Sequence, residues 1–259
     1  MKGFRRFWGV TLAVAGRNFH NTVTNPAILI PSIAAPLVFF VVFAGGLSGV
    51  GKAPGFDFPS GYTTFQFVFI LIQASAFAGI FGGIGMGRDF ESGFMRRLML
   101  AAPTRRGIVA GYALASLGRV ILVYAVLMVV GAFTGVHLDG SFLQVALLLV
   151  LTASFSLVAG LWAMGIALRL RTPQAAPLMM MPVFVSIFLG PVFVPLALLT
   201  GWVEAAAKVN PVTRFLQAGR GLISGRPDGT ALAFGASAAL IALFVVWALT
   251  GLARAERSA

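Results

Sequence analysis

The sequence predicts an all-α membrane protein with six transmembrane helices. The mean hydropathy is +0.95, and only 10% of the 259 residues are charged, whereas about a quarter of the residues of a soluble globular domain are charged. Apolar runs of about 20 residues recur along the chain, and a helix of that length crosses a hydrocarbon core roughly 30 Å thick. Short polar loops separate the runs, so we expect one bundle without a soluble domain.

The first 24 residues predict an amphipathic helix that lies in the membrane interface. Their apolar residues follow a spacing of three or four, which places them on one helical face. These residues are Phe4, Trp8, Leu12, Ala15 and Phe19. A cleaved signal peptide is the alternative, because basic residues precede a short apolar run. That run is directly followed by Arg17, Asn18 and His20, which favours an uncleaved helix.

Six apolar segments then predict the membrane domain, over residues 25–252. The segments are 26–47, 65–86, part of 108–136, 142–168, 177–199 and 231–252. The first carries prolines, which membrane helices tolerate where neighbours or water satisfy the freed carbonyl groups. Residues 201–229 are too polar to span a membrane and too apolar for a simple loop.

Basic residues predict the orientation of the bundle, because cytoplasmic loops are enriched in Lys and Arg. With the N-terminus inside, thirteen basic residues lie on the inner side: Lys2, Arg5, Arg6, Arg17, Arg88, Arg96, Arg97, Arg105, Arg106, Arg169, Arg171, Arg254 and Arg257. The outer side carries Lys52, Lys208, Arg214, Arg220 and Arg226. We therefore expect both termini in the cytoplasm, with 253–259 as a tail. Arg119 lies within the third span, where it either reaches back to the headgroups or faces a polar pathway.

A charged segment, 88–106, interrupts the apolar pattern between the second and third spans. It predicts a short surface helix over about 89–100, with Asp89 and Glu91 near its start and basic residues towards its end. Pro103 then turns the chain, and two arginines mark its return to the membrane. The residues alone leave two alternatives open. The helix either docks into a groove of a soluble partner or belongs to an ordinary loop that sets the topology.

Two motifs resemble those of type-2 ABC exporter permeases, particularly the daunorubicin-resistance group. ESGFMRRLMLAAPTRR, residues 91–106, resembles the first cytoplasmic loop of that family, with Glu91, Gly93, Arg97, Leu98, Pro103 and Arg105 or Arg106 at the matching positions. NPVTRFLQAGRGLISG, residues 210–225, resembles the stretch that precedes the last span of the family. Both motifs lie in the expected loops, and the resemblance covers essentially the whole chain.

The resemblance implies that the loop after the second span is a coupling helix, which sits in a cleft of a separate ATP-binding subunit. The coupling residues would be Asp89, Glu91, Gly93, Phe94, Arg96, Arg97, Leu98, Pro103 and Arg105. Residues 201–225 would form an outer re-entrant hairpin shaped by Asn210, Pro211 and Arg220. The chain would be a multi-pass protein of the bacterial cytoplasmic membrane, paired with a second copy or a sister permease. ATP and Mg²⁺ would be bound by the partner, so no cofactor, metal or catalytic residue is expected here.

Other functional classes fit the sequence less well. GLSGVGKA, residues 46–53, has the spacing of a P-loop up to its lysine, but Ala53 replaces the Mg²⁺-binding Ser or Thr. An ion-coupled carrier usually holds an acid or histidine within the membrane, whereas every Asp, Glu and His here falls in a predicted loop or terminus. The chain has no cysteine and no visible nucleophile–base pair, which disfavours an intramembrane enzyme. The sequence has no basic polar domain of the kind that binds nucleic acid, so we expect no nucleic-acid partner.

The predicted substrate is a hydrophobic or amphipathic drug or lipid-like molecule that is exported. The second and fifth spans are rich in Phe and Met, which form adaptable apolar surfaces. The resemblance places these spans along the pathway, with Gln73, Phe77, Met181 and Phe184 as candidate lining residues. A polysaccharide or glycoconjugate exporter and an ion-coupled carrier are the alternatives. Gly79, Gly83 and Gly87 share one helical face and predict close helix packing inside the subunit.

Overall fold

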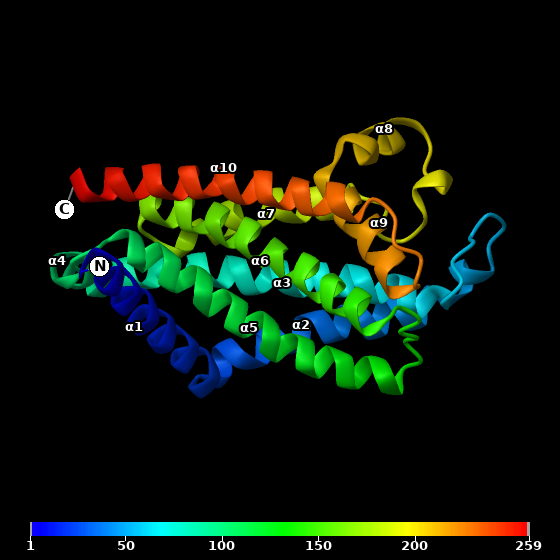
Figure 1. Cartoon of the computed structure of the whole chain (residues 1–259), viewed down its shortest axis with the longest axis horizontal. Coiled ribbons are helices and arrows are strands. Elements are labelled where there is room, and N and C mark those ends of the chain that lie inside the picture. The colour runs from blue at the N-terminus through cyan, green and yellow to red at the C-terminus, as the bar shows by residue number, and fades with distance from the viewer. Residues whose placement is uncertain (1, 258–259) are drawn as a thin grey trace.

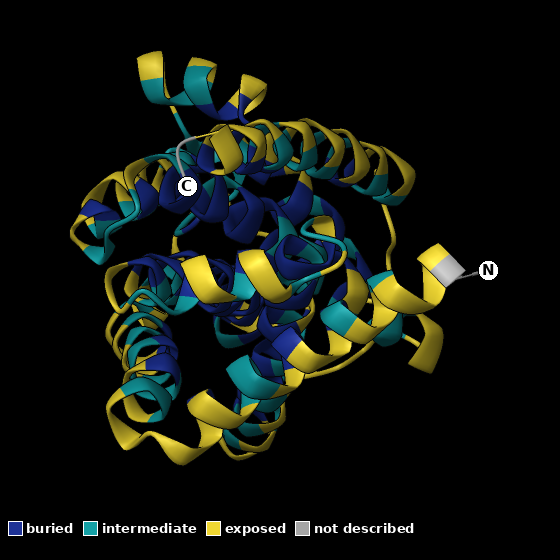
Figure 2. Cartoon of the chain, turned by 90° about the vertical axis from the view of Figure 1, so that its left-hand side faces the viewer, coloured by how far each residue is buried: buried dark blue, intermediate teal, exposed yellow. Residues whose placement is uncertain are grey.

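The helix α3 (Gly61–Glu91) is the centre of the bundle. The computed structural model describes residues 2–257, leaving out the side chain of Lys2; residue 1 and the last two residues of the predicted tail lie outside this description. Of the most apolar 18-residue stretch of α3, 94% is buried, whereas the corresponding share in α10 (Thr230–Arg257) is 17%. Figure 2 shows the buried residues gathered in the middle of the end-on view. An apolar helix buried on all sides needs a shell of other helices.

That shell confirms an all-helical membrane class. Within residues 2–257 there is no strand, and five helices are long and apolar enough to cross a membrane. Besides α3 and α10 they are α2 (Pro26–Phe40, continued by a π-helical turn to Gly45), α5 (Arg106–Phe133) and α6 (Phe142–Leu170). Of these, α2, α5 and α6 contact α3 directly, as does the shorter α7 (Ala176–Phe188).

The predicted fifth span is the one that the structure shortens. The sequence predicts a single apolar segment over 177–199, but α7 ends at Phe188. Gly190 and Pro191 follow, and Pro195 precedes a single 3₁₀ turn, Leu196–Leu198. Proline cannot donate a backbone hydrogen bond and disfavours helix for the residue before it. Mean hydropathy alone does not register this break, because the many Val, Leu and Phe residues around the prolines keep the average of the segment apolar.

A helix occupies the predicted N-terminal amphipathic segment, as α1 (Lys2–Thr24). It packs against α5, where the small Gly111 lets the helices approach: a Cβ on Gly111 would lie 2.6 Å from the Cβ of Val14. The side of α1 that faces away carries exposed Phe4, Trp8 and Leu12. An outward apolar and aromatic side is suited to a lipid interface, which stays a prediction for this helix.

The two ends of the bundle differ in what they carry. The start of α1, the short helix α4 (Phe94–Ala101) and the C-terminal end of α10 lie at one end (Figure 1). The helices α8 (Gly201–Val209) and α9 (Pro211–Ile223) lie at the other end. The two helices meet at Asn210, in the segment predicted as a hairpin. The start of α1 and the end of α10 therefore lie on the same side of the bundle.

The glycine face of α3 packs inside the subunit, as the sequence predicts. A Cβ on Gly79 would lie 2.3 Å from the carbonyl oxygen of Ser156, and one on Gly83 would lie 2.5 Å from the Cβ of Ala163. Both contacts are with α6. Further along the same face, a Cβ on Gly87 would lie 2.9 Å from the backbone of Thr172. The glycines therefore set the close approach of α3 and α6.

Candidate functional site

The predicted surface helix begins later than the sequence suggests. We expected one helix over 89–100 with its acidic residues at the N-terminal end. Instead α3 continues to Glu91, a turn follows at Ser92 and Gly93, and α4 begins at Phe94. Gly93 has a φ of 71°, in the left-handed region that favours glycine. The dipole argument for Asp89 and Glu91 is therefore wrong, since both lie at the C-terminal end of a helix, where acids are disfavoured.

Asp89 compensates for this position by bonding to two other helices. Arg17 of α1 donates two hydrogen bonds to its carboxylate, each 2.8 Å long. The hydroxyl of Tyr112 on α5 donates to the same carboxylate. The hydrogen bonds to Asp89 raise the pKa of Arg17 above its ordinary value, so the guanidinium stays charged. One carboxylate thus ties the end of α3 to α1 and α5.

Arg17 also connects this cluster to α4. Its guanidinium lies over the ring of Phe94, 3.7 Å from the centroid, in the geometry of a cation–π contact. Phe94 is the first residue of α4. We call Arg17, Asp89, Phe94 and Tyr112 the junction cluster. Through these four side chains α1, α3, α4 and α5 meet at the turn between α3 and α4.

The helix α4 has one side attached to the bundle and another exposed. Met95 and Met99 are buried, and Leu98 is partly buried against the same core. Arg96, Arg97 and Leu100 are exposed, and Leu100 keeps 83% of its surface accessible. Glu91, at the end of α3, is exposed beside them. A short helix that presents two arginines and a leucine on its free side is suited to contacting another protein.

The chain after α4 connects this end to the C-terminal helix. Pro103 is exposed in the turn before α5. Arg105 donates from Nε to the carbonyl of Met99 at 3.1 Å, and its Nη1 lies 3.5 Å from the carboxylate of Glu256 on α10. Arg105 therefore has partners within the subunit, unlike the exposed arginines of α4, for which the described residues provide no ion pair.

The hairpin residues named from the sequence lie together at the opposite end. The side chain of Asn210 accepts a hydrogen bond from the backbone of Val212 at 2.9 Å and donates to the carbonyl of Ser186, so it caps α9 and fastens it to α7. Pro211 occupies the first turn of α9, where its missing N–H costs nothing.

Arg220 is the buried anchor of α9. Its guanidinium donates to the carbonyl oxygens of Phe65 (3.4 Å), Pro191 (2.7 Å) and Val192 (3.0 Å). It also lies 3.3 Å from the centroid of the Phe65 ring. The arginine thus satisfies carbonyl groups freed where the chain leaves α7, and it joins α9 to the start of α3.

Of the four predicted pathway residues, the structure brings two together. Phe77 of α3 and Phe184 of α7 form an edge-to-face pair with centroids 5.2 Å apart. Met181 points outward, with 60% of its surface accessible. Gln73 is fully buried in α3, and neither end of its amide has a hydrogen-bond partner within residues 2–257. An unpaired buried amide is costly and uncommon.

Tyrosines are the side chains that bridge helices and that the sequence analysis missed. The chain has three, each within or at the edge of an apolar segment. Tyr112 belongs to the junction cluster. Tyr124 of α5 shares hydrogen bonds with Ser75 of α3 (2.6 Å) and Thr152 of α6 (2.7 Å). The signal was available, because a tyrosine hydroxyl inside an apolar run needs a buried partner.

The P-loop spacing at 46–53 has no counterpart in the fold. Residues Ser48–Lys52 form a 3₁₀ turn that precedes Ala53 and an irregular segment. A P-loop requires a long helix at this point, whose N-terminal amides hold the phosphates. Within residues 2–257 there is also no group of three or more His, Asp or Glu side chains arranged to hold a metal ion.

Comparison with known proteins agrees with this architecture. The family described as ABC-2 type transporter matches residues 10–223. The chain is also 24% identical, over 223 residues, to the daunorubicin resistance ABC transporter permease protein DrrB1 of Streptomyces coeruleorubidus. That alignment covers 85% of this chain and 77% of the relative. The match includes α1 from residue 10 onward, the junction cluster, α4 and all of α9, so the chain belongs to the ABC-2 type transporter family.

Proposed function

We propose that this permease exports a hydrophobic or amphipathic small molecule, and that a separate ATP-binding subunit drives it by binding the exposed side of α4. Members of the family are transmembrane subunits, and ATP hydrolysis belongs to their partner subunit. What this chain must supply is therefore a surface on which the partner acts and a path for the substrate.

The junction cluster carries this proposal. The exposed side of α4 is joined to the bundle by the Gly93 turn, by buried Met95 and Met99, and by the contact between Phe94 and Arg17. A force on α4 would pass through Asp89 to α1, through Tyr112 to α5 and through the chain itself to α3. Gly93 can adopt backbone conformations that other residues disfavour, so it is suited to act as the hinge where such a movement bends the chain.

In this proposal the α4 end of the bundle is cytoplasmic, as is the beginning of the chain. Most basic residues predicted for the inner side lie near it, including Arg88, Arg96, Arg97 and Arg105. Such an excess of Arg and Lys marks the cytoplasmic side of membrane proteins. A second permease copy, or a sister permease, would complete the path, since one subunit leaves apolar faces of α7 and α10 exposed.

The proposed substrate class rests on the side chains along α7 and α3. Phe184 and Phe77 form an aromatic contact, and Met181 and Phe188 of α7 are exposed. Aromatic and methionine side chains bind flat apolar molecules without strict geometry. Gln73 offers an unpaired amide within the apolar interior of α3. The relative DrrB1 is named for resistance to daunorubicin, which supports a drug-like substrate.

The experiment is co-purification of this permease with the ATP-binding protein encoded beside it, followed by ATPase and transport assays in vesicles. The variant Glu91→Ala/Arg97→Ala removes two exposed charges without touching the core. We expect it to weaken association about tenfold, the equivalent of about 0.7 kcal/mol at each charge. Transport should fall at least in proportion.

Arg214→Ala is the matched control, because Arg214 is also exposed but lies on α9, at the opposite end of the bundle. It should leave association unchanged. The coupling role of α4 is refuted if the Glu91/Arg97 variant matches the wild type in association, ATP hydrolysis and transport.

A further inference from the structure

Arg119 poses a problem that the proposed function does not solve. It lies within α5 with only 5% of its surface accessible. Its Nε has no hydrogen-bond partner, and the described residues 2–257 provide no ion pair or hydrogen bond for its guanidinium. A buried charge without a partner is strongly unfavourable. Because residues 2–257 supply no partner for this charge, a group bound in the adjoining space is needed to balance it.

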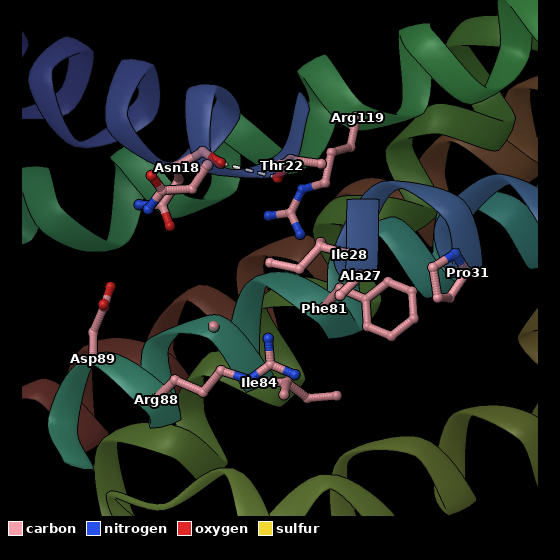
Figure 3. A pocket seen from close by; sticks show the side chains of 12 residues that line it. Asn18, Thr22, Ala27, Ile28, Pro31, Phe81, Ile84, Arg88, Asp89 and Arg119 are labelled. Carbon is pink, nitrogen blue, oxygen red and sulfur yellow. Dashed lines mark hydrogen bonds between the residues drawn. The ribbon is translucent and has the colours of Figure 1, made fainter. Parts of the chain in front are cut away.

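The guanidinium of Arg119 points into a partly open cavity of about 150 Å³ that lies between α1, α2, α3 and α5. Arg119 reaches it past Gly82 of α3, where a Cβ would lie 3.4 Å from Nη2. Figure 3 shows Arg119 from α5 and Arg88 from α3 extending into the same space, with Asn18 and Thr22 of α1 at its side. The polar lining therefore combines two cations and one carboxylate, that of Asp89, with uncharged polar groups.

The charges around this cavity do not cancel. Asp89 also lines it, but its carboxylate is already bonded to Arg17 and Tyr112. Arg88 has no ion pair or side-chain hydrogen bond within the described residues. With Asp89 balanced by Arg17, the two arginines leave the cavity with a net positive charge. Arginine is the side chain that best matches the geometry of a phosphate group.

The place of the cavity in the bundle indicates where such an anion comes from. It lies next to the connection between α1 and α2, and Ala27 and Ile28 at the start of α2 form part of its lining. Beyond it, α2 presents exposed Ile30 and Val38. An apolar surface next to a cationic cavity fits a molecule with a phosphate head and hydrocarbon tails.

We propose that this cavity binds the phosphate headgroup of an anionic phospholipid, with Arg119 as the buried contact and Arg88 as the contact at its mouth. The acyl chains would run along the outer side of α2. The bound lipid would hold α1 and α2 against α3 and α5, next to the junction cluster. This inference does not depend on which molecule the protein exports.

The test measures binding of a short-chain, water-soluble phosphatidylglycerol to the full-length, detergent-solubilised permease by isothermal titration. We expect Arg88→Gln to weaken binding about fivefold, as one interfacial charge is worth about that much. Arg119→Gln should weaken it roughly ten- to a hundredfold, because charge-assisted hydrogen bonds in a buried site are stronger. Arg214→Gln, an exposed arginine at the opposite end, should bind like the wild type.

Thermal unfolding in nanodiscs adds a readout that a merely structural arginine would not give. In phosphatidylcholine alone, Arg119→Gln should melt at or above the wild-type temperature, because it removes an unpaired buried charge. When phosphatidylglycerol is added, the wild type should gain stability and the variant should not. If Arg119→Gln does not fold, Arg88→Gln carries the test, since Arg88 is exposed.

Two results would overturn the proposal. If both variants bind phosphatidylglycerol like the wild type, the cavity is not the site. If inorganic phosphate alone binds as tightly as the phospholipid and is lost in the same variants, the cavity holds a soluble anion and the lipid assignment is wrong.

Discussion

Replacing Asp89 by asparagine removes the charge that holds α1 against the junction of α3 and α4, and it hardly alters the volume. The side chain of Asp89 is 13% exposed and that of Arg17 is 34% exposed. Exposed ion pairs contribute about 0.2–1 kcal/mol, and breaking a fully buried pair costs about 3–5 kcal/mol. A half-buried pair with two hydrogen bonds of 2.8 Å lies between these limits. We expect Asp89→Asn to destabilise the protein by about 2 kcal/mol.

The assay is thermal unfolding of the detergent-solubilised protein in a double-mutant cycle with Arg17→Ala. For a chain of this size about 2 kcal/mol corresponds to a fall in Tm of roughly 4–8 °C. The double variant should lose less than the sum of the single losses, with a coupling energy of about 1–2 kcal/mol. In vesicles with the ATP-binding subunit, the proposed function further predicts less transport per ATP hydrolysed by Asp89→Asn.

Glu204 and Lys208 provide the control pair within the same chain. They lie one helical turn apart on α8, 2.6 Å from each other, with side chains that are 36% and 60% exposed. Their coupling should be only about 0.3–0.5 kcal/mol. A coupling energy between Arg17 and Asp89 no larger than this would refute the reasoning, because the pair would then stabilise the contact between α1 and α3 no more than an exposed ion pair does.

Two further predictions concern the packing of the bundle. Gly79→Ala should destabilise the protein by about 2–3 kcal/mol, because the new Cβ would meet backbone atoms of α6 at 2.3 Å and 2.7 Å. Gly85→Ala is the control on the same helix; its Cβ would have nothing within 4 Å, so this variant should be neutral or slightly stabilising. Equal melting temperatures for the two variants would contradict the packing of α3 against α6. Arg220→Gln should lower the free energy of unfolding by roughly 2–4 kcal/mol, since it leaves buried carbonyl groups unpaired. The control Arg214→Gln changes an exposed arginine on the same helix and should alter stability by less than about 0.5 kcal/mol. Similar unfolding curves for the two variants would show that the carbonyl contacts of Arg220 contribute little.

The bundle could be predicted from the sequence because the bilayer imposes one rule on every residue. Runs such as 142–168 and 231–252 must be helical if they are to satisfy their backbone in hydrocarbon, and α6 and α10 occupy both. The glycine face of α3 was equally legible, since a regular spacing of four places residues on one side of a helix. Such inferences need only the local sequence.

The prediction was weaker where local backbone choices compete. The run 177–199 is apolar throughout, but the helix ends at Phe188, in the middle of the run, because Gly190, Pro191 and Pro195 follow. Between α3 and α4, a single left-handed glycine moved Asp89 and Glu91 from the start of one helix to the end of another. A helix boundary depends on the conformation of one or two residues, and composition averages them away.

Pairings between distant residues lay beyond the sequence for a different reason. Arg17 was counted as a topology signal and Asp89 as a helix-start acid, yet the two are 72 residues apart and bonded to each other. For Arg119 the sequence left two alternatives open, a side chain that reaches back to the headgroups and one that faces a polar pathway. The structure adds that α1 closes over that side of α5, so the guanidinium enters a cavity made by four helices. Which side of a membrane helix is covered is decided by its neighbours, and those neighbours include an N-terminal helix that hydropathy assigns to the interface.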